Sequence, residues 1–101
     1  MPPLENLALG VGFRPAAIFV LAPAGRDPSE ARSRGVVTVA VPVDSGNVNA
    51  AIGDKAIDSY LAAGAFVVFA CRSSTVAAKF EQAMARNPAF RAAHPAPETV
   101  Q

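Results

Sequence analysis

The feature that most constrains this chain is a pair of apolar runs on either side of a helical segment. The runs are residues 35–43 (GVVTVAVPV) and residues 65–71 (AFVVFAC). Neither alternates polar and apolar residues, so both are expected to be strands buried on two faces, as in a parallel sheet. Residues 47–63 between them carry apolar side chains at helical spacing. Parallel strands need a long crossover, usually a helix, so the stretch predicts a βαβ unit.

A third apolar run, residues 16–21 (AAIFVL), is expected to be the first strand. The polar residues 26–34 that follow lack an apolar stripe. We expect an exposed loop there, with at most a turn or two of helix capped by Asp27 or Ser29. So short a link leaves two topologies open, a long-looped antiparallel hairpin or a minimal crossover to a parallel neighbour.

The sequence leaves the start of the first helical segment, residues 47–63, open, whereas it signals the start of the last helix clearly. Gly53 lies in the middle of the first and weakens it by roughly 1 kcal/mol relative to Ala, so the helix has an alternative start with Asp54 as N-cap. One of the three hydroxyl residues at positions 73–75 is expected to cap a last helix that runs to about Arg86. Pro42, near the end of residues 35–43, indicates that this part of the strand lies at an edge or leaves the ladder.

These elements predict an α/β fold: a small three- to four-stranded mixed sheet with a central βαβ unit and two main helices. The 101 residues suffice for one domain. We expect residues 1–14 to be an N-terminal arm or edge strand and residues 15–93 to be the single α/β domain. Residues 94–101 are Pro-rich and lack apolar periodicity, so we expect a disordered C-terminal tail.

The composition favours association with protein over nucleic acid or a membrane. Hydrophobic residues make up 51% of the chain and charged residues 17%, which is below the usual ~25%. Apolar surface must then be covered, so we expect a homo-oligomer or a protein partner. A net charge of +1 does not favour nucleic acid, and no apolar run reaches the ~18 residues of a membrane span. We expect no signal peptide, and the single cysteine fits the reducing cytoplasm.

Ligands of open α/β sheets bind outside the carboxyl ends of the strands, and two loops of the βαβ unit meet that condition. The residues of this expected ligand-binding rim are Asp44, Ser45, Asn47, Arg72, Ser73 and Ser74. Cys71, which ends a strand just before a helix, is the candidate catalytic residue. The helix dipole and the adjacent Arg72 would both favour its thiolate. The competing interpretation, which we favour, is a buried small hydrophobic residue that finishes the strand.

Arg72, Lys79 and Arg86 are spaced by seven and form a candidate stripe for an anionic partner along the last helix. Glu81 and the near-zero net charge instead favour the solvated side of an amphipathic helix. One His, one Cys and no tight carboxylate cluster predict no metal site. Glycine patterns that cradle phosphate are missing, so no cofactor is expected.

One family resemblance accompanies these patterns. Residues 56–77 (AIDSYLAAGAFVVFACRSSTVA) resemble the core of DsrE-like proteins: a helix, a Gly-containing turn, a strand, and a Cys followed by a small polar residue. Residues 36–49 resemble that family's second strand and ligand loop, and residues 17–32 its first strand and the loop after it. The family's long helix between these strands and its fifth strand lack counterparts here. The resemblance implies a flavodoxin-like fold, homo-oligomers, and Cys71 as a persulfide carrier.

Two functions follow. The favoured one is a small non-catalytic α/β protein that acts by association, as an accessory subunit, a phage or virion component, or an inhibitor of a larger machine. The alternative is a DsrE-like sulfur carrier that uses Cys71 as its persulfide site. An enzymatic role is the less favoured expectation, because no catalytic constellation accompanies Cys71.

Overall fold

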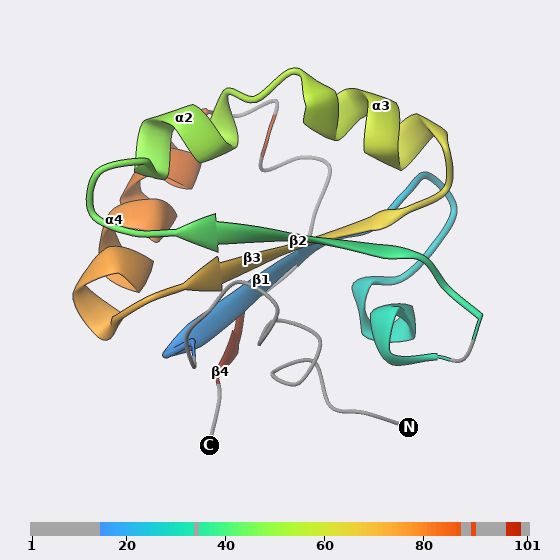
Figure 1. The fold of residues 1–101 in the computed structure, drawn as a ribbon, viewed down its shortest axis with the longest axis horizontal. Coiled ribbons are helices and arrows are strands. Elements are labelled where there is room, and N and C mark those ends of the chain that lie inside the picture. Colours follow the sequence, from blue (N-terminus) through green and yellow to red (C-terminus); the bar gives the residue numbers. More distant parts are fainter. Residues whose placement is uncertain (1–14, 34, 88–89, 91–96, 100–101) are drawn as a thin grey trace.

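A computed structural model describes residues 15–33, 35–87, 90 and 97–99, and it shows a small α/β domain built on one mixed sheet (Figure 1). The strand order is β2-β3-β1-β4. The strands are β1 (Ala17–Leu21), β2 (Thr38–Val43), β3 (Phe66–Cys71) and β4 (Pro97–Thr99). The helices are the 3-10 helix η2 (Pro28–Arg32) and the α-helices α2 (Val48–Ile52), α3 (Ala56–Ala62) and α4 (Ser74–Ala85). The predicted fold class is confirmed.

The central βαβ unit is also confirmed. β2 and β3 are parallel, in register from Thr38 opposite Phe66 to Val43 opposite Cys71. The crossover is two helices rather than one, and they meet at Gly53, which is the C-cap of α2. The Asp54 side chain then accepts a hydrogen bond of 2.9 Å from the backbone N–H of Ala56, at the start of α3.

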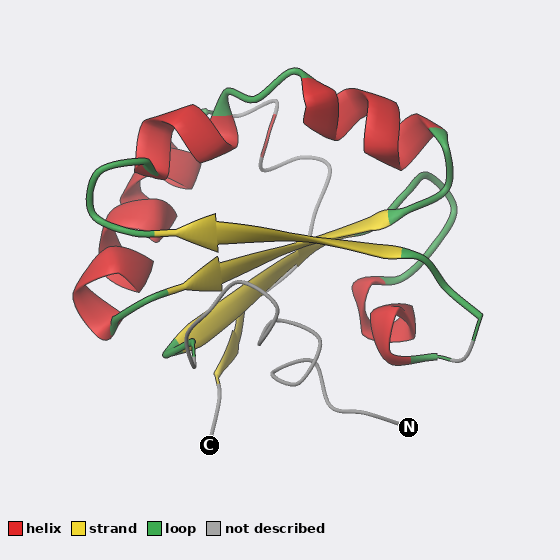
Figure 2. Cartoon of the chain, in the orientation of Figure 1, coloured by secondary structure: helices red, strands yellow, loops and turns green. Residues whose placement is uncertain are grey.

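The α-helices cover one face of the sheet, and η2 lies toward the other (Figure 2). Side chains alternate between the two faces along β1 and β3, as expected for a strand. On the helical face, the Phe80 ring of α4 lies 4.9 Å from the Phe19 ring and 5.1 Å from the Phe69 ring. On the opposite face, Ala31 of η2 packs with the buried cluster that includes Phe66. The sheet therefore has a hydrophobic core cluster on each of its two faces.

Two strand predictions were wrong. β1 forms neither of the two topologies left open for it, because β3 lies between β1 and β2, and β1 is antiparallel to β3. All six residues of β3 are buried, so this strand needs a neighbour on each side, and the apolar β1 provides the second one. β2 is not buried on both faces. Residues 38–41 are only half-buried and Pro42 is exposed, because β2 is an edge strand.

Near the C-terminus the structure describes one further strand, β4. β4 pairs with β1, Ala17 lying opposite Thr99, although the sequence predicted a disordered tail there. The physical reason is that β1 would otherwise leave one side of its backbone unpaired. The expected arm at residues 1–14 and the other residues of the tail from 94 onward lie outside the described residues.

The local helix signals were predicted well. Asp27 caps η2 in a capping box with Glu30. Ser73 caps α4, since its hydroxyl accepts a hydrogen bond of 3.2 Å from the backbone N–H of Val76. Residue type and position narrowed each cap to two or three candidates, and the structure selects Asp27 and Ser73 among them.

Candidate functional site

The carboxyl ends of β2 and β3 lie side by side, as the expected rim requires. The backbone N–H of Arg72 donates to the carbonyl of Val43 at 2.9 Å. Two polar side chains at this rim accept hydrogen bonds from backbone N–H groups of the same turn. Asp44 Oδ1 accepts from the N–H of Gly46, and Asn47 Oδ1 accepts from the N–H of Asp44, both at 2.8 Å. The rim is thus a well-ordered turn beside a helix cap.

The remaining rim residues are exposed: Ser45, Arg72, Ser73 and Ser74. Ser73 directs its hydroxyl to the α4 backbone. The structure therefore brings together all six predicted rim residues at one end of the sheet. It uses at least three of them, Asp44, Asn47 and Ser73, to fix the local backbone.

Cys71 lies inside the core rather than on this rim. Its exposed fraction is 0%, and it packs in the cluster between the sheet and the α-helices. Burial, with a smaller contribution from the charge of Glu81, raises the pKa of the Cys71 thiol to about 12. The helix dipole and Arg72 were expected to favour a thiolate, but removal of the sulfur from water outweighs them. The position suits a buried hydrophobic residue.

The three basic residues of the predicted stripe are all exposed: Lys79 lies within α4, Arg72 precedes its N-cap and Arg86 is its C-cap. Glu81 is exposed on the same helix. Among the described residues, no group of three His, Cys, Asp or Glu side chains is placed to hold a metal ion. Within the same part of the chain, no helix has the length and apolar character needed to cross a membrane.

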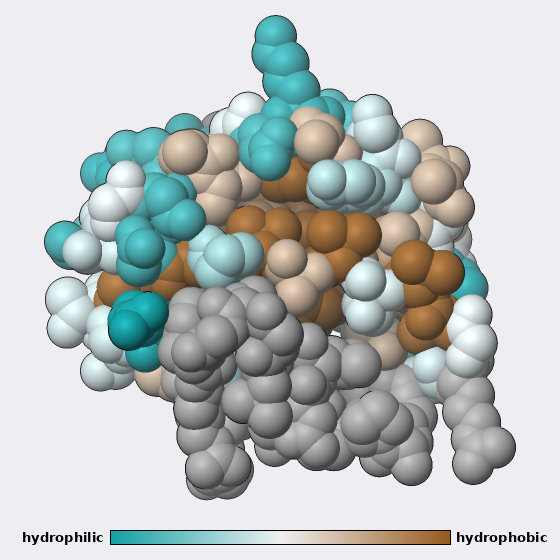
Figure 3. Space-filling view, in the orientation of Figure 1, coloured by the Kyte–Doolittle hydropathy of each residue, from teal (hydrophilic) through white to brown (hydrophobic). Residues whose placement is uncertain are grey.

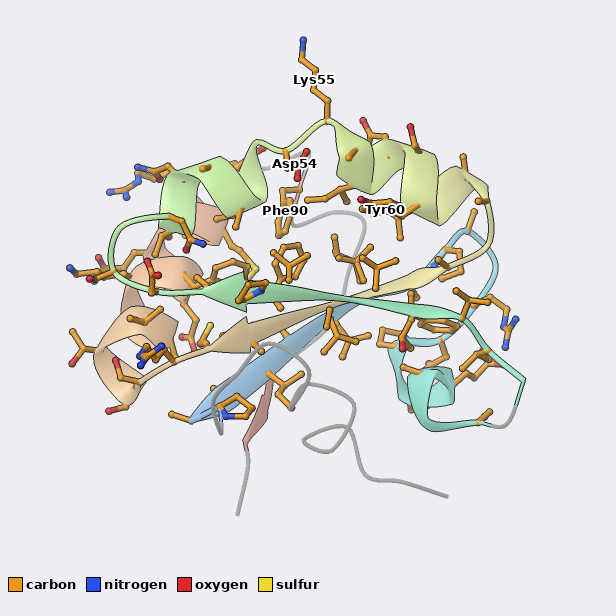
Figure 4. All side chains as sticks on the ribbon, in the orientation of Figure 1. Asp54, Lys55, Tyr60 and Phe90 are labelled. Atoms are coloured by element: carbon orange, nitrogen blue, oxygen red, sulfur yellow. The ribbon has the colours of Figure 1, made fainter. Side chains whose placement is uncertain are left out.

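A small hollow, which the sequence did not predict, opens where α2 meets α3. Its volume is about 210 Å³. Apolar side chains form its floor, including Leu21, Ile57 and Phe90, while Asp54 and Lys55 stand at its mouth. Figure 4 shows Lys55 extending away from the molecule, above Asp54 and Phe90. The volume is below the ~300–1,000 Å³ of typical ligand pockets, so the hollow suits one side chain rather than a cofactor.

The outer edge of β2 is the second feature that the sequence only hinted at. The carbonyls of Val37 and Val43 accept from the N–H groups of Phe66 and Arg72, each at 2.9 Å. Successive residues of a strand direct their backbone groups to opposite sides, so the odd-numbered residues of β2 bond to β3. Thr38, Ala40 and Pro42 consequently direct theirs outward, where no described strand pairs with them.

One end of this edge is closed. Pro42 has no N–H to offer, and its carbonyl accepts a hydrogen bond of 2.9 Å from Asn47 Nδ2. The open part of the edge therefore consists of the N–H and C=O groups of Thr38 and Ala40. We call this part the open edge of β2.

The surroundings of the open edge are apolar. Residues 35–43 contain no charged side chain, and Val37 has an exposed fraction of 64%. Figure 3 shows apolar side chains gathered across the middle of the molecule, over β2. The sequence signal for this edge was Pro42, which predicted that this end of the strand lies at an edge or leaves the ladder, because proline is tolerated in a strand where no ladder donor is needed.

Comparisons with family models, curated proteins and solved structures each found no match to this chain. The resemblance to DsrE-like proteins therefore stays a prediction. The flavodoxin-like fold that it implies has parallel strands, whereas β1 here is antiparallel to β3.

Proposed function

We propose that this protein is a small non-catalytic α/β domain that acts by association with another protein chain, through the open edge of β2. An accessory subunit, a phage or virion component and an inhibitor of a larger machine are all roles of this kind. The observation that carries the proposal is an uncharged edge strand whose Thr38 and Ala40 direct backbone groups outward.

The physical reason is that an unpaired strand edge is a template for another strand. Natural proteins protect such edges with charged side chains, prolines, bulges or covering segments. Among the described residues, Pro42 and Asn47 protect only the carboxyl end of β2 in this way. An added strand would gain main-chain hydrogen bonds at Thr38 and Ala40 and apolar contact with Val37. The free thiol of Cys71 fits a reducing compartment, so we place this association in the cytoplasm.

The alternative function, sulfur transfer through Cys71, has less support. A persulfide carrier needs a thiolate that a donor can reach, and this thiol is buried with a raised pKa. A Cys71→Ser protein that keeps its biological activity would eliminate the alternative.

The proposal is tested with one charged substitution at the open edge and one away from it. Val37 and Tyr60 are the exposed large hydrophobic residues of the described chain, with exposed fractions of 64% and 37%. Val37→Lys places a charge beside the open edge, and Tyr60→Lys is the matched control on α3. We expect Val37→Lys to lose the complex seen in analytical ultracentrifugation and native co-purification, and Tyr60→Lys to keep it. A wild-type monomer with no co-purifying chain would refute the proposal.

A further inference from the structure

We infer that the chain bound at the open edge of β2 is a second copy of the same protein, with the two β2 strands antiparallel about a two-fold axis at Val39. This inference rests on the proposed function, because it assumes that the open edge is the site of association. It adds the identity of the partner and the register of the pairing.

The chemistry of the edge favours a second copy over a different partner. Antiparallel pairing of identical strands is self-complementary, because a two-fold axis exchanges the two partners. β2 and α2, which packs beside it, contain no charged residue, so these two elements would not oppose like charges across the axis. A dedicated partner of different sequence would commonly be selected by complementary charge, and the open edge offers no charge to complement.

The outward backbone groups set the register. In an antiparallel ladder, a hydrogen-bonded pair of residues exchanges two N–H···O bonds. Thr38 and Ala40 are the residues of β2 that direct both groups outward, because Pro42 lacks the N–H. Thr38 of one copy therefore pairs with Ala40 of the other, and the axis passes through Val39, midway between them. Each copy contributes two donors and two acceptors to this ladder.

The side chains agree with this register. Val41 packs at the border of the helical-face core and Val43 within it, so the odd-numbered residues of β2 lie on that face. Across the axis, Val39 would meet its own copy and Val41 would meet the Val37 side chain of the second chain. Cross-strand pairs of β-branched residues stabilise antiparallel sheets. The pairing would also cover Val37, an exposed apolar side chain of the monomer.

Cysteine crosslinking with oxidised glutathione tests the register. Paired residues at a non-hydrogen-bonded position have Cα atoms about 4.5 Å apart, which is within reach of a disulfide. Val39→Cys is expected to form a covalent dimer. Val37→Cys and Val41→Cys should each fail alone and crosslink when mixed. The wild-type protein is the control, because its Cys71 is buried. A Thr38→Cys protein that crosslinks to itself while Val39→Cys does not would overturn the register.

Two substitutions at one position test the backbone ladder. Ala40→Pro removes an outward donor from each copy, and Ala40→Val adds side-chain bulk but keeps the donor. Loss of two hydrogen bonds by symmetry is expected to weaken the dimer about tenfold or more for Ala40→Pro, measured by sedimentation, with less effect for Ala40→Val. Far-UV circular dichroism of both variants confirms that they fold. Equal dimer affinities of two folded variants would overturn the inference.

The outcomes separate this inference from the proposed function. A monomeric wild-type protein that still binds a different chain, and loses it with Val37→Lys, would overturn the second copy and leave the proposed function standing. A monomer that binds no chain would overturn both. A dimer with the Val39→Cys crosslink supports both.

Discussion

Thiol labelling of Cys71 gives a quantitative test of where the structure places this residue. The pKa of its thiol rises from 9.0 to about 12. At pH 8 this change lowers the thiolate fraction roughly a thousandfold, since each pKa unit is a factor of ten well below the pKa. An exposed fraction of 0% adds a steric barrier to that chemical one. Labelling of the native protein should therefore proceed only through opening of the fold.

The assay is the rate of reaction with a maleimide at pH 8, with and without urea, compared with a short cysteine-containing peptide. We expect the native rate to be at least about a thousandfold slower than that of the peptide, and to rise in step with the unfolded fraction. Peptide-like labelling without denaturant would refute both the burial of Cys71 and the argument against a sulfur carrier.

The same pKa shift sets a pH dependence of stability. The folded state disfavours the Cys71 thiolate, so it binds the thiol proton more tightly than the unfolded chain does. The contribution of this thiol to stability is complete below about pH 9 and declines as the pH rises from 9 toward 12. The difference in unfolding free energy between the wild type and Cys71→Ala should narrow over that window in urea titrations. A difference that stays constant with pH would contradict the shift.

Three further predictions concern the supports of the fold and of the edge. Phe80→Ala removes a fully buried ring that contacts the rings of Phe19, Phe69 and Phe90, and should cost about 3–5 kcal/mol and lower Tm by more than about 10 °C in calorimetry. Ser73→Ala removes the α4 cap and should cost about 1 kcal/mol in urea unfolding, whereas Ser74→Ala, the matched control, should cost little. Asn47→Ala loses hydrogen bonds to the residues at the end of β2 and should cost about 1–2 kcal/mol, against little for the exposed Asn49→Ala. If Ser74→Ala lost as much unfolding free energy as Ser73→Ala, or Asn49→Ala as much as Asn47→Ala, the stabilising role of the corresponding hydrogen bond would be refuted.

Local signals in the sequence were sufficient for several elements. The capping candidates located both helix starts to within two residues, because a capping side chain acts within three residues of itself, and Asp27 and Ser73 are the caps. The parallel pairing of β2 and β3 followed from the length of the link and from the apolar character of both runs. These predictions depended on neighbours in sequence or on one connection.

The position of β1 and the exposure of β2 before Pro42 could not be obtained in the same way. Both runs are apolar, so either one is suited to the centre of a sheet, and the choice depends on contacts between residues far apart in the chain. The burial of Cys71 was the favoured expectation and is confirmed, but its depth could not be obtained from sequence, for a related reason. The position of Cys71 before a helix and next to Arg72 can be read from the sequence. The depth of burial that dominates the pKa of its thiol arises only when β1 and α4 pack around β3.

Amide hydrogen exchange along β2, measured by NMR at low and high protein concentration, tests the central claim most directly. The N–H groups of Val39 and Val41 bond to β3 and should be protected at both concentrations. Those of Thr38 and Ala40 should exchange rapidly in the dilute monomer and become protected as the protein associates. Protection of Thr38 and Ala40 that does not change with concentration, whether high or absent, would contradict the account of an open edge that pairs with another chain.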